Sequence, residues 1–124
     1  MGKPLGILLI SGAHERAHYA LVLATGAAAL GREVTLFATN AGCRLLLADS
    51  ALAREPREAE VTARGVAGIG ILLEAAEELG LHFLACEAGL RAEGLEAASL
   101  RPGVTVAGVA SFLAAVGDGQ MVTL

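Results

Sequence analysis

The chain has 124 residues, so a single domain spanning residues 1–124 is expected. Hydrophobic residues make up 55% of the chain and aromatic residues only 3%, so its core must be built from Ala, Leu, Val and Ile. The net charge is −4, and there is no run of Lys or Arg. Nucleic-acid binding is therefore disfavoured, because it needs clustered basic side chains that neutralise phosphates.

Membrane insertion is also disfavoured. The longest mostly apolar segment, residues 17–31, is shorter than the ~20 residues that a bilayer-spanning helix needs. The first residues lack the apolar core and the cleavage site of a signal peptide. We therefore expect a cytoplasmic protein, in which Cys43 and Cys86 are free thiols rather than a structural disulfide.

The first half of the chain alternates between apolar and polar segments. Residues 5–10 (LGILLI) and 34–38 (VTLFA) are continuous apolar runs, typical of strands buried on both faces. A largely apolar helix is expected over residues 14–30, ended by a glycine, and a short helix over 43–48. The polar segment 49–65 is expected to be a mobile surface loop that includes a helical turn.

The second half continues the alternation. An amphipathic helix is predicted over residues 66–79. A short helical turn is predicted within residues 89–95, and a further helix over residues 111–116. Strands are predicted at residues 82–85, 104–106 and 121–124. Strands that alternate with helices predict an α/β fold, here an open, mainly parallel five-stranded sheet with helices on both faces.

The carboxyl ends of parallel strands are where such folds place their reactive groups. Three segments follow predicted strands: residues 11–14, 40–43 and 86–87. They are far apart in sequence, and we expect them to converge on one pocket.

Residues 14–18 read His-Glu-Arg-Ala-His, which matches the H-E-x-x-H pattern of zinc proteases. Such an enzyme needs a third protein ligand, and nothing directs the available Glu33 or Asp49 toward this helix. We favour a simpler interpretation, in which these are polar residues at a helix start and Glu15 interacts with the helix dipole. No metal or cofactor is therefore expected, and a zinc hydrolase stays a remote alternative.

The two cysteines differ in their predicted surroundings. Cys86 leaves a buried strand, and the free amides of a following helical turn would favour its thiolate, although Glu87 opposes this. An equally supported interpretation is that Cys86 is a small side chain packed in the core. Cys43 follows the second strand and is either a resolving thiol or, as we favour, a packing residue. His14 is expected near Cys86, where it would tune the thiol.

Two long stretches resemble the DsrE/DsrF-like family of small sulfur-handling proteins. One is Ser11-Gly12 with ALVLATGAAALGREVTLFATNAGCRLLL, residues 20–47, and the other is LACEAGLRAEGLEAASLRPGVTVAGVASFLAAV, residues 84–116. The resemblance implies an open α/β sheet of flavodoxin-like layout and assembly into trimers or hexamers. It also implies that Cys86 is the cysteine that accepts sulfur as a persulfide and passes it to partner proteins.

Two functions from different classes follow. The first is a sulfur carrier that holds persulfide sulfur on Cys86, between a sulfur donor protein and an acceptor protein. The second is a non-catalytic oligomeric or small-ligand-binding module, in which Cys86 is packed or senses redox state. The high apolar content gives separate support to a homo-oligomer, because surplus apolar surface needs a partner.

Overall fold

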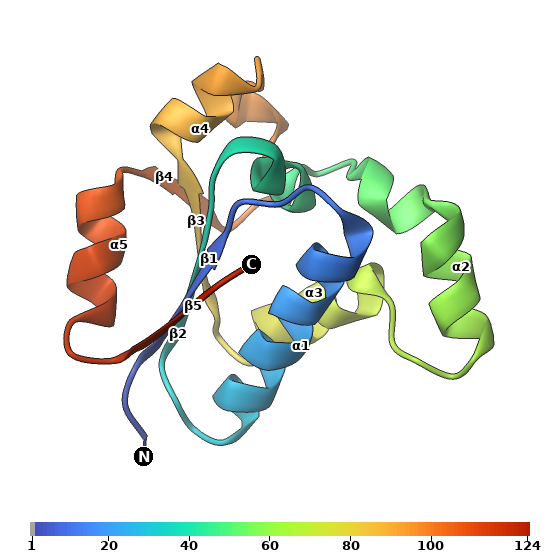
Figure 1. The fold of residues 1–124 in the computed structure, drawn as a ribbon, viewed down its shortest axis with the longest axis horizontal. Coiled ribbons are helices and arrows are strands. Elements are labelled where there is room, and N and C mark those ends of the chain that lie inside the picture. The colour runs from blue at the N-terminus through green and yellow to red at the C-terminus, as the bar shows by residue number, and fades with distance from the viewer. Residues whose placement is uncertain (1) are drawn as a thin grey trace.

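The computed structural model describes residues 2–124. Five strands form one sheet in the order β4-β3-β2-β1-β5, and every neighbouring pair is parallel (Figure 1). The strands are β1 Leu5–Leu9, β2 Val34–Ala38, β3 His82–Cys86, β4 Val104–Ala107 and β5 Gln120–Thr123. The predicted α/β class is confirmed, and the sheet is parallel throughout.

The strand order determines where the helices lie. The chain steps in one direction from β1 to β4, and right-handed crossovers then place the connecting helices on one face of the sheet. The return from β4 to β5 runs the other way, so its helix covers the opposite face. The direction in which successive strands join the sheet thus reverses once, after β4. In the flavodoxin order 2-1-3-4-5 this reversal follows the second strand. The layers are flavodoxin-like, and the strand order differs from that of flavodoxin.

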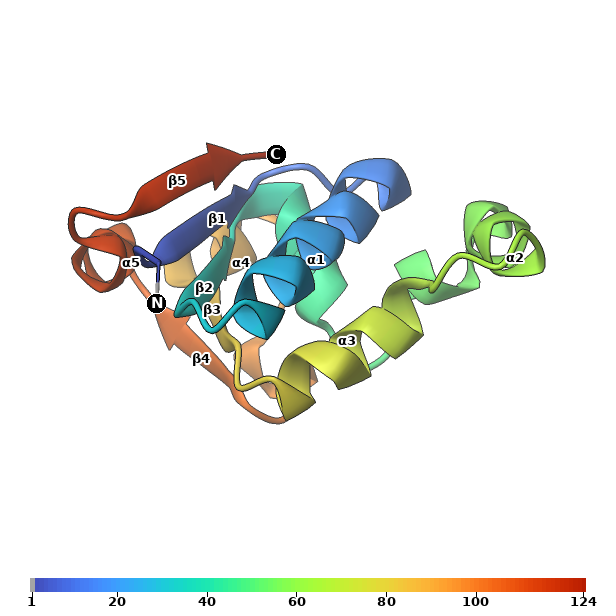
Figure 2. The same cartoon turned by 90° about the horizontal axis from the view of Figure 1, so that it is seen from below.

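The main core lies under the helices α1, His14–Ala29, and α3, Ile69–Glu78 (Figure 2). The small side chains of Ala17, Ala20 and Ala24 are fully buried and let α1 approach the sheet closely. Large aliphatic side chains fill the space between the layers, and each contributes about 1.5–3 kcal/mol by burial. They include Ile7, Leu9, Leu21, Leu36, Ile69 and Leu73.

The opposite face carries one helix, α5, Val109–Val116, seen on the other side of the sheet in Figure 2. Phe112 stacks on Phe37 with ring centroids 4.9 Å apart. Gly6 on β1 admits the helix, because a Cβ there would overlap the side chain of Val116. The helix α5 packs on β1 and β2.

The polar segment 49–65 is not a loop, which corrects the sequence prediction. Residues Ala51–Arg54 form a 3-10 turn, η2, and Pro56–Ala63 form helix α2, which lies beyond α1 and α3 from the sheet (Figure 2). Pro56 stands at the start of α2, where its fixed φ suits a first turn. Composition hid this helix, because only Val61 of its residues is buried.

The remaining elements differ from the sequence predictions in type or by a few residues in their bounds. The segment after β2 is a 3-10 helix, η1, Asn40–Leu46, and β3 leads directly into α4, Glu87–Ala92. A third 3-10 turn, η3, covers Ala97–Ser99. The predicted helix over residues 66–79 begins only at Ile69, and the one over 111–116 begins two residues early, at Val109. Within residues 2–124 no helix is both long and apolar enough to cross a membrane.

Candidate functional site at the carboxyl edge of the sheet

The three segments that follow β1, β2 and β3 meet at one edge of the sheet. Gly42 N–H donates to the carbonyl of Ile10 at 2.9 Å, which joins the second segment to the first. Gly12 lies so close to Ala41 that a Cβ on the glycine would be 2.9 Å from the Ala41 Cβ. Glycines therefore allow the close packing of these two segments.

The third segment joins the other two through Gly89 of α4. A Cβ on this glycine would lie 2.5 Å from Thr39 Oγ1 and 2.6 Å from Asn40 N, distances that real Cβ atoms do not reach. Arg44 and Glu93 add an ion pair of 2.8 Å between η1 and α4. The position of α4 is thus fixed against η1.

Cys86 is the last residue of β3 and the N-cap of α4. Its side chain is partly exposed, and its Sγ accepts the Gly89 N–H at 3.4 Å. The side chain packs beside the Phe37–Phe112 cluster, so it lies on the α5 face of the sheet. A backbone N–H aimed at sulfur stabilises a thiolate, which is the nucleophilic form of cysteine.

Cys43 is close by but has a different environment. It lies in η1, is fully buried, and its Sγ donates to the Ala38 carbonyl at 3.5 Å. Burial raises the pKa of the Cys43 thiol to about 11, and the nearby side chains of Cys86 and Glu93 act in the same direction. The Cys86 backbone N–H and Arg44 oppose the rise without cancelling it. This environment favours a protonated packing residue over a resolving thiol.

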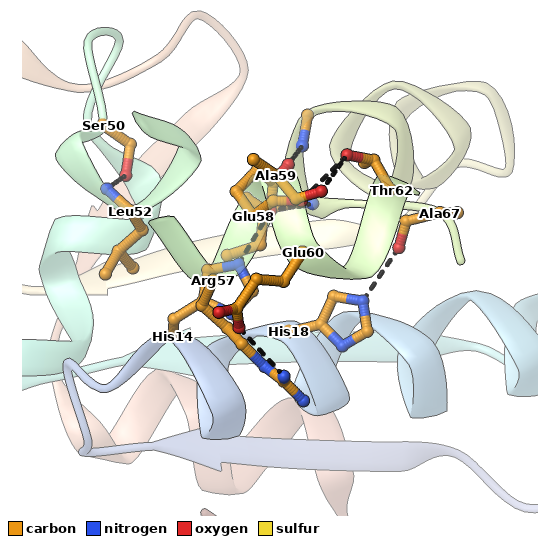
Figure 3. Close-up of polar contacts among 12 residues, drawn as sticks. His14, His18, Ser50, Leu52, Arg57, Glu58, Ala59, Glu60, Thr62 and Ala67 are labelled. Carbon is orange, nitrogen blue, oxygen red and sulfur yellow. Dashed lines mark hydrogen bonds and ion pairs between the residues drawn. The ribbon is translucent and has the colours of Figure 1, made fainter. Parts of the chain in front are cut away.

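His14 does not contact Cys86. It stands in the first turn of α1, on the sheet face opposite the Cys86 side chain, and its Nε2 lies 2.7 Å from Glu58 Oε1 of α2 (Figure 3). A carboxylate only accepts, so Nε2 carries the hydrogen. Nδ1 of His14 is buried without a hydrogen-bond partner in the protein. The structure therefore assigns His14 to the contact between α1 and α2.

The second histidine of the H-E-x-x-H segment is also engaged. His18 Nε2 donates to the Ala67 carbonyl at 2.8 Å, and the two imidazole rings are nearly parallel, with centroids 5.7 Å apart (Figure 3). The two acidic residues considered as third ligands lie elsewhere, with Glu33 at 3.5 Å from His82 and Asp49 paired with Arg54. Across residues 2–124, no three His, Cys, Asp or Glu side chains form a group that could hold a metal.

A groove on the α5 face is the feature that the sequence interpretation missed. It has a volume of about 550 Å³ and lies between α5 and the strands β3 and β4. Ala107, which pairs in register with Cys86, is one of its lining residues. The alternation of His82, Leu84 and Cys86 along β3 was the available signal, because a period of two places all three on one face.

The fold and site define an open parallel α/β protein with one partly exposed thiol at the carboxyl edge of its sheet. The model of the DsrE/DsrF-like family matches residues 3–124. The chain belongs to this family, as its sequence motifs indicated.

Individual proteins are similar to this chain in sequence or in fold. The chain is 28% identical to the uncharacterized protein YrkE of Bacillus subtilis, over 96% of this chain and 94% of YrkE. Its fold is similar to that of the ychN protein from E. coli, with a TM-score of 0.76, 16% identity and full coverage of both chains. A protein of unknown function from Methanobacterium thermoautotrophicum has a TM-score of 0.61 and 20% identity, with 98% of this chain and 99% of the other covered.

Proposed function

We propose that this protein is a sulfur carrier that holds sulfane sulfur on Cys86. The Cys86 thiolate attacks the outer sulfur of a donor persulfide, R–S–SH, so that a new S–S bond forms on Cys86 and R–S⁻ leaves. An acceptor thiolate on a partner protein then attacks the outer sulfur of the Cys86 persulfide. The second step restores the Cys86 thiolate, and neither step needs an outside oxidant or reductant.

The observation that carries this proposal is the setting of Cys86 itself. Its sulfur is partly exposed, stands at the carboxyl edge of the sheet and accepts a backbone N–H at 3.4 Å. The same N–H is available to the sulfur in each state of the cycle, because thiolate and persulfide are both acceptors. Membership of the DsrE/DsrF-like family supports the same chemistry.

A single thiol is sufficient for this cycle. Cys43 is buried, and its pKa of about 11 keeps it protonated at neutral pH, so it competes poorly for the sulfur on Cys86. Both cysteines are free, which suits the reducing cytoplasm in which we place the protein. A persulfide on Cys86 is therefore passed to another protein rather than discharged by a disulfide within the chain.

Mass spectrometry tests the proposal directly. The protein is incubated with a cysteine desulfurase and cysteine, or with inorganic polysulfide, and we expect one added sulfur on the peptide that contains Cys86. Cys86→Ser should abolish the addition, whereas the matched variant Cys43→Ser should retain it. If no donor loads the wild-type protein, sulfur transfer is excluded, and a non-catalytic binding or oligomeric module becomes the better description.

We further propose that the chain forms a homo-oligomer, a trimer or a hexamer. Several large apolar side chains are more than half exposed, and surface of this kind favours burial against another copy. They are Tyr19, Leu30, Ile71, Val109 and Leu113. Light scattering after gel filtration measures the mass in solution, and a monomer at micromolar concentration would contradict this part of the proposal.

A further inference from the structure

The groove on the α5 face runs along β3 toward Cys86. Its floor includes His82 and Leu84, and Cys86 is the next residue of β3 on the same face. Thr105 and Ala107 of β4 pair with Leu84 and Cys86 and also line the groove. A molecule that lies in the groove would therefore have one end beside the thiol.

The groove is open because α5 is short and packs on the other half of the sheet. The helix rests on β1 and β2 and presents Ser111 and Ala115 to the groove as a wall. The resulting volume of about 550 Å³ lies in the range of small-molecule sites, which span roughly 300–1,000 Å³. Its lining combines aliphatic side chains with the hydroxyls of Thr35, Thr105 and Ser111. Hydroxyls both donate and accept, so they suit the amide groups of a peptide-like ligand.

The charges of the groove are all at the end far from Cys86. Glu33 is the lining residue with a carboxylate, and His82 lies 3.5 Å from it. The lining contains no Lys or Arg. An anionic donor such as thiosulfate would find no Lys or Arg side chain here, whereas a cationic amine would find the Glu33 carboxylate. His82 is four residues from Cys86, which is about 13 Å along an extended strand.

We propose that this groove binds the sulfur donor, and that the donor is a small peptide-like persulfide with a cationic amine at the end opposite its sulfur. The amine pairs with Glu33, amide groups contact the three hydroxyls, and the persulfide reaches Cys86. The Cys86 thiolate takes the outer sulfur, and the peptide thiolate leaves along the groove. The donor role rests on the proposed sulfur-carrier function, whereas binding in the groove does not.

Binding is tested with an unreactive probe, the tripeptide amide Gly-Gly-Ser-NH₂ with a free amino end. Its matched control is the same peptide with a succinylated, and hence anionic, amino end. In NMR titrations we expect the free-amine peptide to bind at least about tenfold more tightly and to shift the resonances of Thr105 and Ala107. Equal binding of the two peptides, or no binding of either, would overturn the proposal.

Variants locate the site. Glu33→Lys should remove or reverse the preference for the free amine, while Glu78→Lys, the same charge change at an exposed position of α3, should keep it. Ala115→Phe should fill the groove and abolish binding, whereas Ala63→Phe on the exposed part of α2 should not. A preference that survives both Glu33→Lys and Ala115→Phe would place the peptide elsewhere and refute the groove.

The persulfide of Gly-Gly-Cys-NH₂ then separates the two proposals. We expect it to load Cys86 at least about tenfold faster than its succinylated form does. Peptide binding in the groove without loading from any donor would refute the sulfur-carrier function and leave the binding site intact. Loading from inorganic polysulfide without a preference between the two peptide persulfides would refute the groove as the donor site and leave the carrier function intact.

Discussion

The Nε2–H of His14 donates to Glu58 Oε1 over 2.7 Å, and this bond joins the first turn of α1 to α2. The same carboxylate accepts the backbone N–H of Ile69 at 3.1 Å and that of Gly70 at 3.5 Å. Glu58 therefore caps the N-terminus of α3 while it holds α2 against α1. Three helices meet at one carboxylate, which is largely buried.

The first prediction concerns the stability that Glu58 provides. Glu58→Ala leaves the His14 imidazole and two helix N–H groups without their acceptor, so we expect the free energy of unfolding to fall by roughly 1–3 kcal/mol. Urea denaturation measures the loss. Glu60→Ala is the matched control on α2, because Glu60 pairs with the exposed Arg57, and such pairs contribute about 0–1 kcal/mol. Equal losses in the two variants would contradict the role of Glu58.

The second prediction is the pH dependence of this contribution. Burial raises the pKa of Glu58, but the hydrogen bonds from His14, Ile69 and Gly70 outweigh it and hold the pKa below the ordinary value of 4.5. The folded state then binds its proton at lower pH than the unfolded state does. The stabilisation is thus fully present above pH 4.5 and is lost as the pH falls through the folded pKa.

Comparison with Glu58→Gln isolates this effect, because glutamine cannot titrate. The difference in unfolding free energy between the wild type and Glu58→Gln should be constant from pH 6 down to about pH 5 and should shrink below pH 4.5. Denaturant melts at closely spaced pH values measure this difference. A difference that stays constant down to pH 3 would show that Glu58 is not the titrating group.

The central strands β1 and β2 were predictable from sequence because they are buried almost completely on both faces and stand out as apolar runs. For the first three strands, the predicted ranges differ from the observed ones by at most one residue. The predictions were residues 5–10, 34–38 and 82–85. The position of Cys86 at a strand end followed from the same runs. The local sequence was therefore sufficient to predict these strands and the position of Cys86 at the carboxyl edge of the sheet.

Pairings between distant elements were not predictable in the same way. Helix α2 is polar on nearly all sides and is held by Glu58 and Val61, whose partners lie elsewhere in the chain. The same tertiary bond directs His14 toward α2, although its sequence position suggested the vicinity of Cys86. The groove likewise depends on a tertiary contact, because it is left open when α5 packs on β1 and β2. Gly6 and the Phe37–Phe112 contact determine that position of α5.

The third prediction separates the two thiols by their reactivity. Iodoacetamide at pH 8 should alkylate Cys86 and leave Cys43 unmodified, because Cys43 is buried and its pKa is about 11. Peptide mass spectrometry over a time course gives both rates, and urea should make Cys43 as reactive as Cys86. Modification of Cys43 at a comparable rate in the native protein would show that η1 opens readily, and would reinstate Cys43 as a resolving thiol.

The last prediction concerns Gly89, which lies between the thiol and the loop after β2. A methyl group at this position would be 2.5 Å from Thr39 Oγ1 and 2.6 Å from Asn40 N, so Gly89→Ala must displace α4 from η1. We expect a loss of about 1–3 kcal/mol in unfolding free energy, which is typical of overpacking. The Gly89 N–H moves away from Cys86 Sγ with the helix, so sulfur loading and alkylation of Cys86 should both slow.

Gly26→Ala in α1 is the matched control, because no atom lies within 4 Å of a Cβ at that position. The same change there should raise the unfolding free energy by about 0.5–1 kcal/mol and leave Cys86 reactivity unaltered. Thermal or urea denaturation and the alkylation rate are measured on both variants. If Gly89→Ala retained wild-type loading and alkylation rates despite its lower stability, the Gly89 N–H would be dispensable, and the reactivity of Cys86 would have to come from its position at the sheet edge alone.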